Sequence, residues 1–146
     1  MAERTTSRIT IAASRAEIMS VIADLEAYPE WTGSVKSVDI LSVFDDEDER
    51  PAEATFVLDA GAVKDTYTLA YDWDDDSLVS WTLVKGEILT AMTGSYRLND
   101  NGDGTTDVEY ALELDIKIPM IGLLRRKAEK VITDTALKEL QKRVAG

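Results

Sequence analysis

Aromatic side chains that carry a polar group are the residues in this chain best placed to do chemistry. In extended segments the side chains two positions apart share one face. One such face holds four tyrosines and two tryptophans and no charged residue. Its members, segment by segment, are Ala52, Ala54, Phe56 and Leu58; Tyr67, Leu69, Tyr71 and Trp73; Val79, Trp81 and Leu83; Met92, Gly94, Tyr96 and Leu98; and Val108, Tyr110, Leu112, Leu114 and Ile116. A phenol with an ordinary pKa near 10 donates hydrogen bonds but is a poor base at neutral pH.

Other catalytic groups are scarce. The chain has no cysteine and no histidine, which excludes thiolate nucleophiles, disulfides and the commonest general base. Arg97, Asp59 and Glu87 lie in the opposite strand phase or at turns, so they would reach the aromatic face only through a bulge or at its rim. The scarcity of catalytic groups on the aromatic face therefore favours binding over catalysis.

The segment Asn99–Gly104 imitates the start of a calcium-binding loop. The twelfth position of such a loop is a bidentate glutamate, and here it is Tyr110. We therefore expect a hairpin turn at this segment, and neither a metal nor another cofactor.

Length and charge restrict the possible classes of protein. The chain of 146 residues is expected to form one domain, residues 1–146. No apolar run approaches the roughly 20 residues that span a bilayer, and the N-terminus has no apolar signal segment. A cytoplasmic protein without integral membrane contact is expected. The net charge of -12 argues against nucleic acid as a partner.

Two short helices are expected near the N-terminus, after a strand at Thr6–Ile11. Ser14 and Glu17 have the spacing of a capping box, and the apolar residues of Ile18–Leu25 form one helical face. Pro29 restricts the residue before it, so the segment Tyr28–Trp31 should turn the chain out of a short second helix.

Six further strands follow with short connections, which predicts an antiparallel meander because parallel strands need long crossovers. With the first strand this makes a sheet of about seven strands. The expected strands are Val35–Phe44, Ala52–Ala60, Val63–Trp73, Leu78–Val84, Leu89–Leu98 and Thr106–Ile116.

A long C-terminal helix with an apolar residue at every fourth position ends the chain. The stripe consists of Met120, Leu124, Ala128, Ile132, Ala136, Leu140 and Val144. Because each step of four precesses by about 40°, the stripe winds about 240° around the helix, which a curved sheet could cover and a flat one could not. The small residues Ala128 and Ala136 could mark room for a ligand; a solid core is the alternative.

The same helix is basic. Between Arg125 and Arg143 there are seven basic and three acidic residues, an excess of four positive charges on an acidic protein. A solvated face, partly neutralised by the pairs Asp134–Lys138 and Glu139–Arg143, is the simplest interpretation. A weak contact with an anionic surface or a protein is the other.

The order of these elements resembles the START-like helix-grip superfamily, also called SRPBCC, and within it the bacterial polyketide cyclase/dehydrase and lipid-transport type. The resemblance spans essentially the whole chain. It is carried by Ile18–Leu25, by Tyr28–Trp31, by Val79–Leu83, by Gly94–Leu98 and by the segment 119–123 that opens the final helix. It implies an α+β fold in which a curved antiparallel sheet wraps around the C-terminal helix, with a deep cavity between them for lipids, polyketides or other hydrophobic molecules.

Three hypotheses about function follow. The first is binding or transport of a hydrophobic small molecule in that cavity. The second is a polyketide cyclase/dehydrase that uses a tyrosine or a carboxylate at the cavity mouth. The third is a protein-interaction module that uses the basic helix. The residues expected to contact a ligand are Trp31, Phe56, Tyr67, Tyr71, Trp73, Trp81, Met92, Tyr96, Tyr110, Leu124, Ala128 and Ile132.

Overall fold

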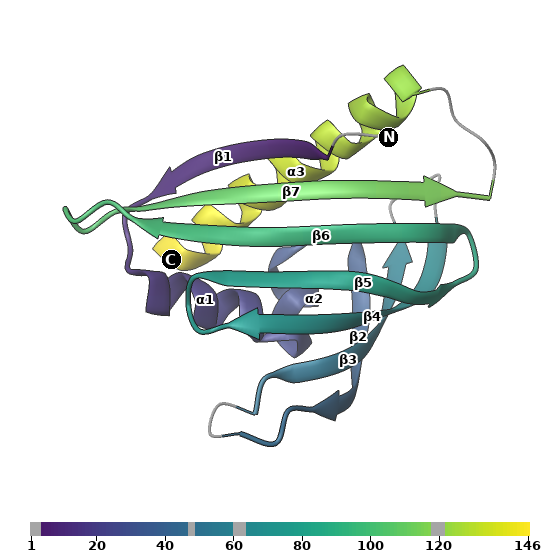
Figure 1. Ribbon diagram of the computed structural model, residues 1–146, viewed down its shortest axis with the longest axis horizontal. Helices are drawn as coiled ribbons and strands as arrows, with labels where there is room; N and C mark the ends of the chain where they lie inside the picture. Colours follow the sequence, from purple (N-terminus) through teal and green to yellow (C-terminus); the bar gives the residue numbers. More distant parts are fainter. Residues whose placement is uncertain (1–3, 47–48, 60–63, 118–121) are drawn as a thin grey trace.

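A curved antiparallel sheet carries the helices on one of its faces (Figure 1). The computed structural model describes residues 4–46, 49–59, 64–117 and 122–146. Its strands are β1 (Thr5–Ile11), β2 (Val35–Val43), β3 (Pro51–Asp59), β4 (Lys64–Asp74), β5 (Leu78–Gly86), β6 (Leu89–Asp100) and β7 (Thr106–Ile116). Its helices are α1 (Arg15–Ala23), the 3-10 turn η1 (Leu25–Ala27), α2 (Tyr28–Trp31) and α3 (Gly122–Ala145). The predicted helix-grip fold is confirmed.

The strand order is β1-β7-β6-β5-β4-β3-β2, so β2 to β7 form the predicted meander and β1 pairs with the last strand. The predicted phase of the strands is also confirmed. In β7 the residues Val108, Tyr110, Leu112 and Leu114 are buried, whereas Glu109 and Glu113 between them are partly exposed. Alternation of polar and apolar residues therefore determines which face of each strand lies inward.

The N-terminal helices begin as the sequence suggests. The Glu17 amide donates to the Ser14 hydroxyl at 3.2 Å, which caps α1. The segment Tyr28–Trp31 does not follow the second helix but is the second helix itself, α2, with Pro29 in its first turn. Proline is tolerated there because the first turn has no intrahelical acceptor for its missing N–H.

Helix α3 lies against β1, β7 and α1, and its buried face coincides only in part with the predicted stripe. Leu140 of the stripe is fully buried, and Ala136 and Val144 pack against the core. Glu129, Thr133, Leu137 and Leu140 are at most 2% exposed, whereas Ile132 is 42% exposed. The polar members of the buried face bond to β1: Ser7 and Thr133 share a hydrogen bond of 2.6 Å between their hydroxyls. Hydrogen bonds to β1 therefore set the rotation of this half of α3. Met120 lies outside the described residues.

The ion pairs of α3 also differ from the predicted ones. Asp134 pairs with Lys130 at 3.3 Å, and Arg143 pairs with Glu30 of α2 at 3.3 Å. The Glu139 carboxylate accepts a hydrogen bond of 3.0 Å from the Gly33 amide. The helix charges thus join α3 to α2 and to the loop that follows it.

Candidate ligand-binding site

A continuous row of aromatic rings crosses the concave face of the sheet. Along the row, successive ring centroids lie 4.6 to 6.5 Å apart. Each of these rings is less than 10% exposed, and the members in order are Tyr67, Phe56, Tyr71, Trp81, Tyr96 and Tyr110. Tyr96 and Tyr110 are the closest pair at 4.6 Å.

Strand register explains why these residues meet. Phe56 lies opposite Tyr67, Tyr71 opposite Trp81, and Tyr96 opposite Tyr110. Cross-strand neighbours on one face have side chains close enough for ring contact. The row therefore follows from antiparallel pairing of strands that each place aromatic residues in the inward phase.

The hydroxyl groups of the row are unusual for buried tyrosines. Tyr28, beside the row on α2, donates its hydroxyl to the Ile22 carbonyl at 2.6 Å. The hydroxyls of Tyr67, Tyr71, Tyr96 and Tyr110 have no hydrogen-bond partner within the described part of the chain. In that same part, Trp31 Nε1 is the one fully buried side-chain N or O atom that lacks a partner. The four hydroxyls therefore keep a small solvent-accessible surface, although each tyrosine as a whole is buried.

The electrostatics of the row keep these phenols protonated. Burial raises the pKa of Tyr71 and Tyr96 well above the ordinary value, and the neighbouring tyrosines raise it further. Burial likewise raises the pKa of Tyr67 and Tyr110. At neutral pH the row thus offers hydrogen-bond donors and weak acceptors in an apolar setting, and it offers no base.

Two buried carboxylates were not predicted from the sequence. Asp65 is 4% exposed and accepts hydrogen bonds from the Glu87 and Leu89 amides at 3.0 and 2.9 Å. Glu129 is 1% exposed and accepts from Thr5 Oγ1 at 2.7 Å and from the Leu114 amide at 2.8 Å. Asp65 lies two residues before Tyr67 in the same strand, so strand alternation could have predicted that it faces inward. Glu129 lies in a basic helix, where no sequence pattern indicated that it is buried.

The other expected ligand contacts lie around the row. Trp31 touches Tyr28, their ring centroids 5.0 Å apart, and Tyr28 in turn lies 6.3 Å from Phe56. Trp73 stacks on Tyr71 at 5.5 Å, and its Nε1 donates to the Pro51 carbonyl. Trp31 therefore flanks the row on the helix side, and Trp73 flanks it on the strand side.

Of the three ligand contacts expected from α3, the structure describes the side chains of two, Ala128 and Ile132. The side chain of Leu124 lies outside the described part of the structure. Ala128 is half-buried, and the exposed Ile132 lies seven residues, close to two helical turns, before Glu139. Because Glu139 bonds to Gly33, this face of α3 points toward α2 rather than toward β1.

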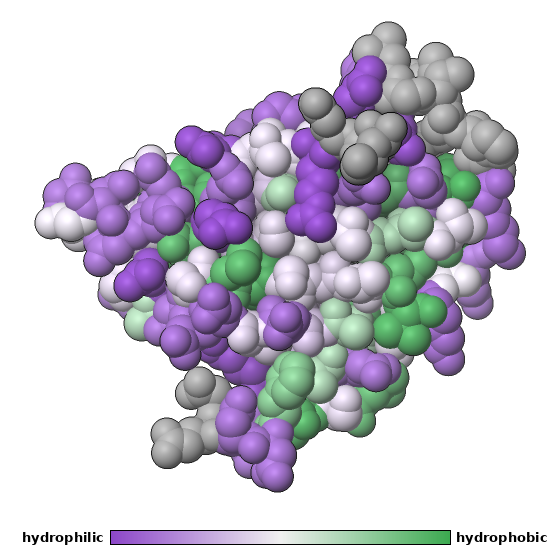
Figure 2. All heavy atoms as spheres, viewed as in Figure 1, coloured by the Kyte–Doolittle hydropathy of each residue, from purple (hydrophilic) through white to green (hydrophobic). Residues whose placement is uncertain are grey.

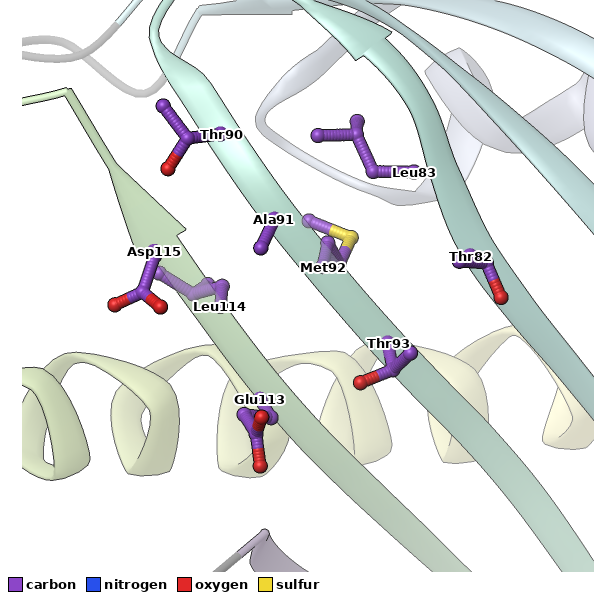
Figure 3. Close-up of a pocket in the computed structure, with 9 residues that line it drawn as sticks. All are labelled: Thr82, Leu83, Thr90, Ala91, Met92, Thr93, Glu113, Leu114 and Asp115. Carbon is purple, nitrogen blue, oxygen red and sulfur yellow. The ribbon is translucent and has the colours of Figure 1, made fainter. Parts of the chain in front are cut away.

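Met92 belongs to a separate hollow between β5, β6 and β7, with a volume of about 290 Å³ (Figure 3). Figure 3 shows Leu83 of β5 and Met92 of β6 directed into the space between these two strands. On the outer face of the sheet, green hydrophobic atoms gather toward the end where β5 and β6 are joined (Figure 2). Val84 in this region is 52% exposed.

The described residues contain no group of three Asp or Glu side chains arranged to hold a metal ion. No helix in the described ranges has the length and apolar character needed to cross a membrane.

Comparisons with known proteins agree with this architecture. The model of a family described as polyketide cyclase / dehydrase and lipid transport matches residues 2–145. A START superfamily protein from Mycobacterium smegmatis has a TM-score of 0.89 at 22% identity, with 97% of each chain covered. The Zhui aromatase/cyclase from a Streptomyces species has a TM-score of 0.78 at 14% identity, covering 98% of this chain and 93% of that one.

A protein from Thermus thermophilus is similar to the same degree, with a TM-score of 0.78 at 21% identity over 98% of this chain and 97% of that one. Among curated protein sequences nothing matches. Likenesses at such identities establish the helix-grip fold and leave the activity to be argued from the site.

Proposed function

Because this chain belongs to the polyketide cyclase / dehydrase and lipid transport family, we propose that it binds a hydrophobic small molecule that carries hydroxyl or carbonyl groups. The ligand would lie between the concave face of the sheet and α3. Its apolar surface would contact the aromatic row, and its oxygen atoms would bond to the tyrosine hydroxyls.

One observation carries this proposal: four protonated phenol groups on one apolar face have no hydrogen-bond partner in the described chain. Buried polar groups are normally hydrogen-bonded, and the exceptions call for an explanation. A row of apolar ring surfaces with a few polar groups that fix orientation is typical of small-molecule sites. A ligand with oxygen atoms would supply the missing partners.

The family description also names cyclases and dehydrases, which need an acid or base to move protons. The raised pKa values of the tyrosines oppose their use as bases. The carboxylates of Asp65 and Glu129 are each held by two hydrogen bonds, which oppose their movement toward a substrate. These contacts favour binding over cyclisation as the proposal.

The test uses native mass spectrometry and quenching of tryptophan fluorescence with three probes: a 4-alkylphenol, a fatty acid and an aromatic polyketone. We expect the alkylphenol or the polyketone to bind. Tyr96→Phe should then weaken binding by about 2- to 10-fold while leaving stability unchanged, because it removes one hydrogen bond to the ligand and none within the protein.

Tyr28→Phe is the matched control. Its hydroxyl bonds to the Ile22 carbonyl, so its loss should lower the unfolding free energy by about 1 kcal/mol and leave ligand affinity unchanged. The absence of binding by all three probes, or an equal effect of both variants on affinity, would contradict the proposal.

A further inference from the structure

The sheet contains an opening between β5 and β6. Their pairing extends from Leu78–Arg97 to Thr82–Thr93 and stops there, although both strands continue toward their connection. They approach each other again at Gly86, where a Cβ atom would lie 2.8 Å from the Leu89 carbonyl oxygen. The opening is therefore bounded at both ends, and we call it the window.

A buried carboxylate anchors the connection at one end of the window. Asp65 of β4 binds the amides of Glu87 and Leu89, and the Lys117 amide donates to the Ile88 carbonyl at 2.9 Å. The connection between β5 and β6 thus bonds to β4 and to the end of β7. Next to it, the pairing of β6 with β7 is shifted between Leu89 and Ala91. Since these bonds hold the connection in place, the opening is a preformed part of the sheet.

Residues from both faces of the sheet line the window. Its walls include inward-facing Leu83, Met92 and Leu114 and outward-facing Thr82, Thr93 and Glu113 (Figure 3). Leu83 is two residues from Trp81, and Met92 is two residues from Gly94, so both lie on the face that carries the aromatic row. The Trp81 ring lies directly over Gly94. The inward-facing walls of the window therefore lie next to the middle of the row along β5 and β6.

We propose that the window holds the tail of an elongated ligand, which extends from the aromatic row through the sheet between Leu83 and Met92. This inference rests on the proposed function. The apolar walls can pack against an alkyl or polyene segment. At the outer rim, Thr82, Thr93 and Glu113 can form hydrogen bonds with a hydroxyl or amine at the end of that segment. An anionic end is disfavoured there, because the Glu113 carboxylate would repel it.

The experiment uses 4-alkylphenols with tails from propyl to dodecyl. In the wild-type protein, affinity should rise with tail length while each added methylene is buried in the window, and it should level off without falling once the tail reaches solvent on the outer face. Met92→Trp fills the window, so each methylene that it displaces should weaken binding by about fourfold, while propylphenol is affected less than twofold. Val84→Trp adds the same side chain on the outward phase of β5 and should leave the whole series unchanged.

A second measurement does not depend on filling the opening. The chain has no cysteine, so Met92→Cys introduces a single thiol into it. We expect dodecylphenol to slow alkylation of this thiol at least tenfold and propylphenol to leave it unchanged. Val84→Cys should react at the same rate with and without either phenol.

The possible failures are distinguishable. If none of the three probe classes (alkylphenol, fatty acid or polyketone) binds the wild-type protein, the proposed function fails and the window inference fails with it. If only the alkylphenols fail to bind, the window inference is overturned and the proposed function stands. If the phenols bind but Met92→Trp weakens short and long tails equally, or dodecylphenol does not protect the Met92→Cys thiol, the window inference alone is overturned.

Discussion

The indole ring of Trp81 lies against the backbone of Gly94, its partner on the neighbouring strand. A Cβ atom at Gly94 would lie 2.4 Å from ring atoms Cε2 and Cζ2, a separation that real side chains do not tolerate. The absence of a side chain at position 94 thus lets the indole lie flat on β6. In this position Trp81 contacts Tyr71, Tyr96 and Tyr110 together.

Gly94→Ala should displace Trp81 and disorder the row. We expect a loss of unfolding free energy of about 1–3 kcal/mol, as for other overpacked cores, with a change in near-UV circular dichroism. Gly33→Ala is the control, because the nearest atom to its added Cβ is Glu139 Oε2 at 3.7 Å, an ordinary contact. Equal stabilities for the two variants in urea unfolding would contradict the assigned contact.

Asp65→Asn should loosen the connection between β5 and β6. An amide has one acceptor oxygen where the carboxylate has two, so one of the two bonded backbone amides loses its partner. The expected cost is about 1–3 kcal/mol in urea unfolding, with faster hydrogen exchange at Glu87 and Leu89. Asp72→Asn, an exposed position on the opposite face of the same strand, should have little effect. Unchanged exchange at Glu87 and Leu89 would refute the role of Asp65.

Glu129→Gln should weaken the attachment of α3 to the sheet. The described pairing of β1 with β7 ends at Thr5–Leu112, and the Glu129 carboxylate binds the next inward amide of β7, that of Leu114. Glutamine can accept from the Leu114 amide and donate to the Thr5 hydroxyl, so both bonds persist but lose the negative charge of the acceptor, at a cost of about 1–2 kcal/mol. Thermal unfolding compared with Glu26→Gln, an exposed position, measures this cost. A melting temperature equal to that of the control would count against it.

The five tyrosines should resist ionisation until the protein unfolds. Burial raises the pKa of each of them above the ordinary value of 10.0. The unfolded chain therefore releases protons above pH 10 that the folded chain retains, so stability is complete below pH 10 and falls as pH rises beyond it. In an alkaline titration, tyrosinate absorbance and the loss of circular dichroism should rise together. Tyrosinate signal from a fully folded protein below pH 11 would show that the phenols are freely solvated.

The strands were largely predictable because each depends on alternation within a few residues. The expected strand Thr106–Ile116 coincides with β7, and Leu78–Val84 falls two residues short of β5. The aromatic row was predictable for the same reason, since the inward phase names its members and antiparallel pairing brings them together.

The buried face of α3 was only partly predictable from its apolar stripe. Leu140, Ala136 and Val144 of the stripe reach the core, but the buried Glu129 and Thr133 lie outside the stripe. The polar part of that face is selected by two hydrogen bonds over more than 120 positions of sequence: one that the hydroxyls of Ser7 and Thr133 share, and one from Thr5 to Glu129. Hydrophobic periodicity cannot predict such hydrogen bonds, because it follows only the spacing of apolar residues. As a result Ile132, an apolar member of the stripe, is exposed, and the charged Glu129 is buried.

The sequence by itself determined the meander, the inward phase and the chemistry of the aromatic face, because these properties are local. Tertiary structure decided the rotation of α3, the unpartnered hydroxyls and the window. Each of these depends on where distant groups meet: Asp65 reaches amides 22 and 24 residues away, and the window exists where two adjacent strands stop pairing. A pattern within one segment cannot specify contacts between residues far apart in the sequence, because the packing of the whole sheet determines them.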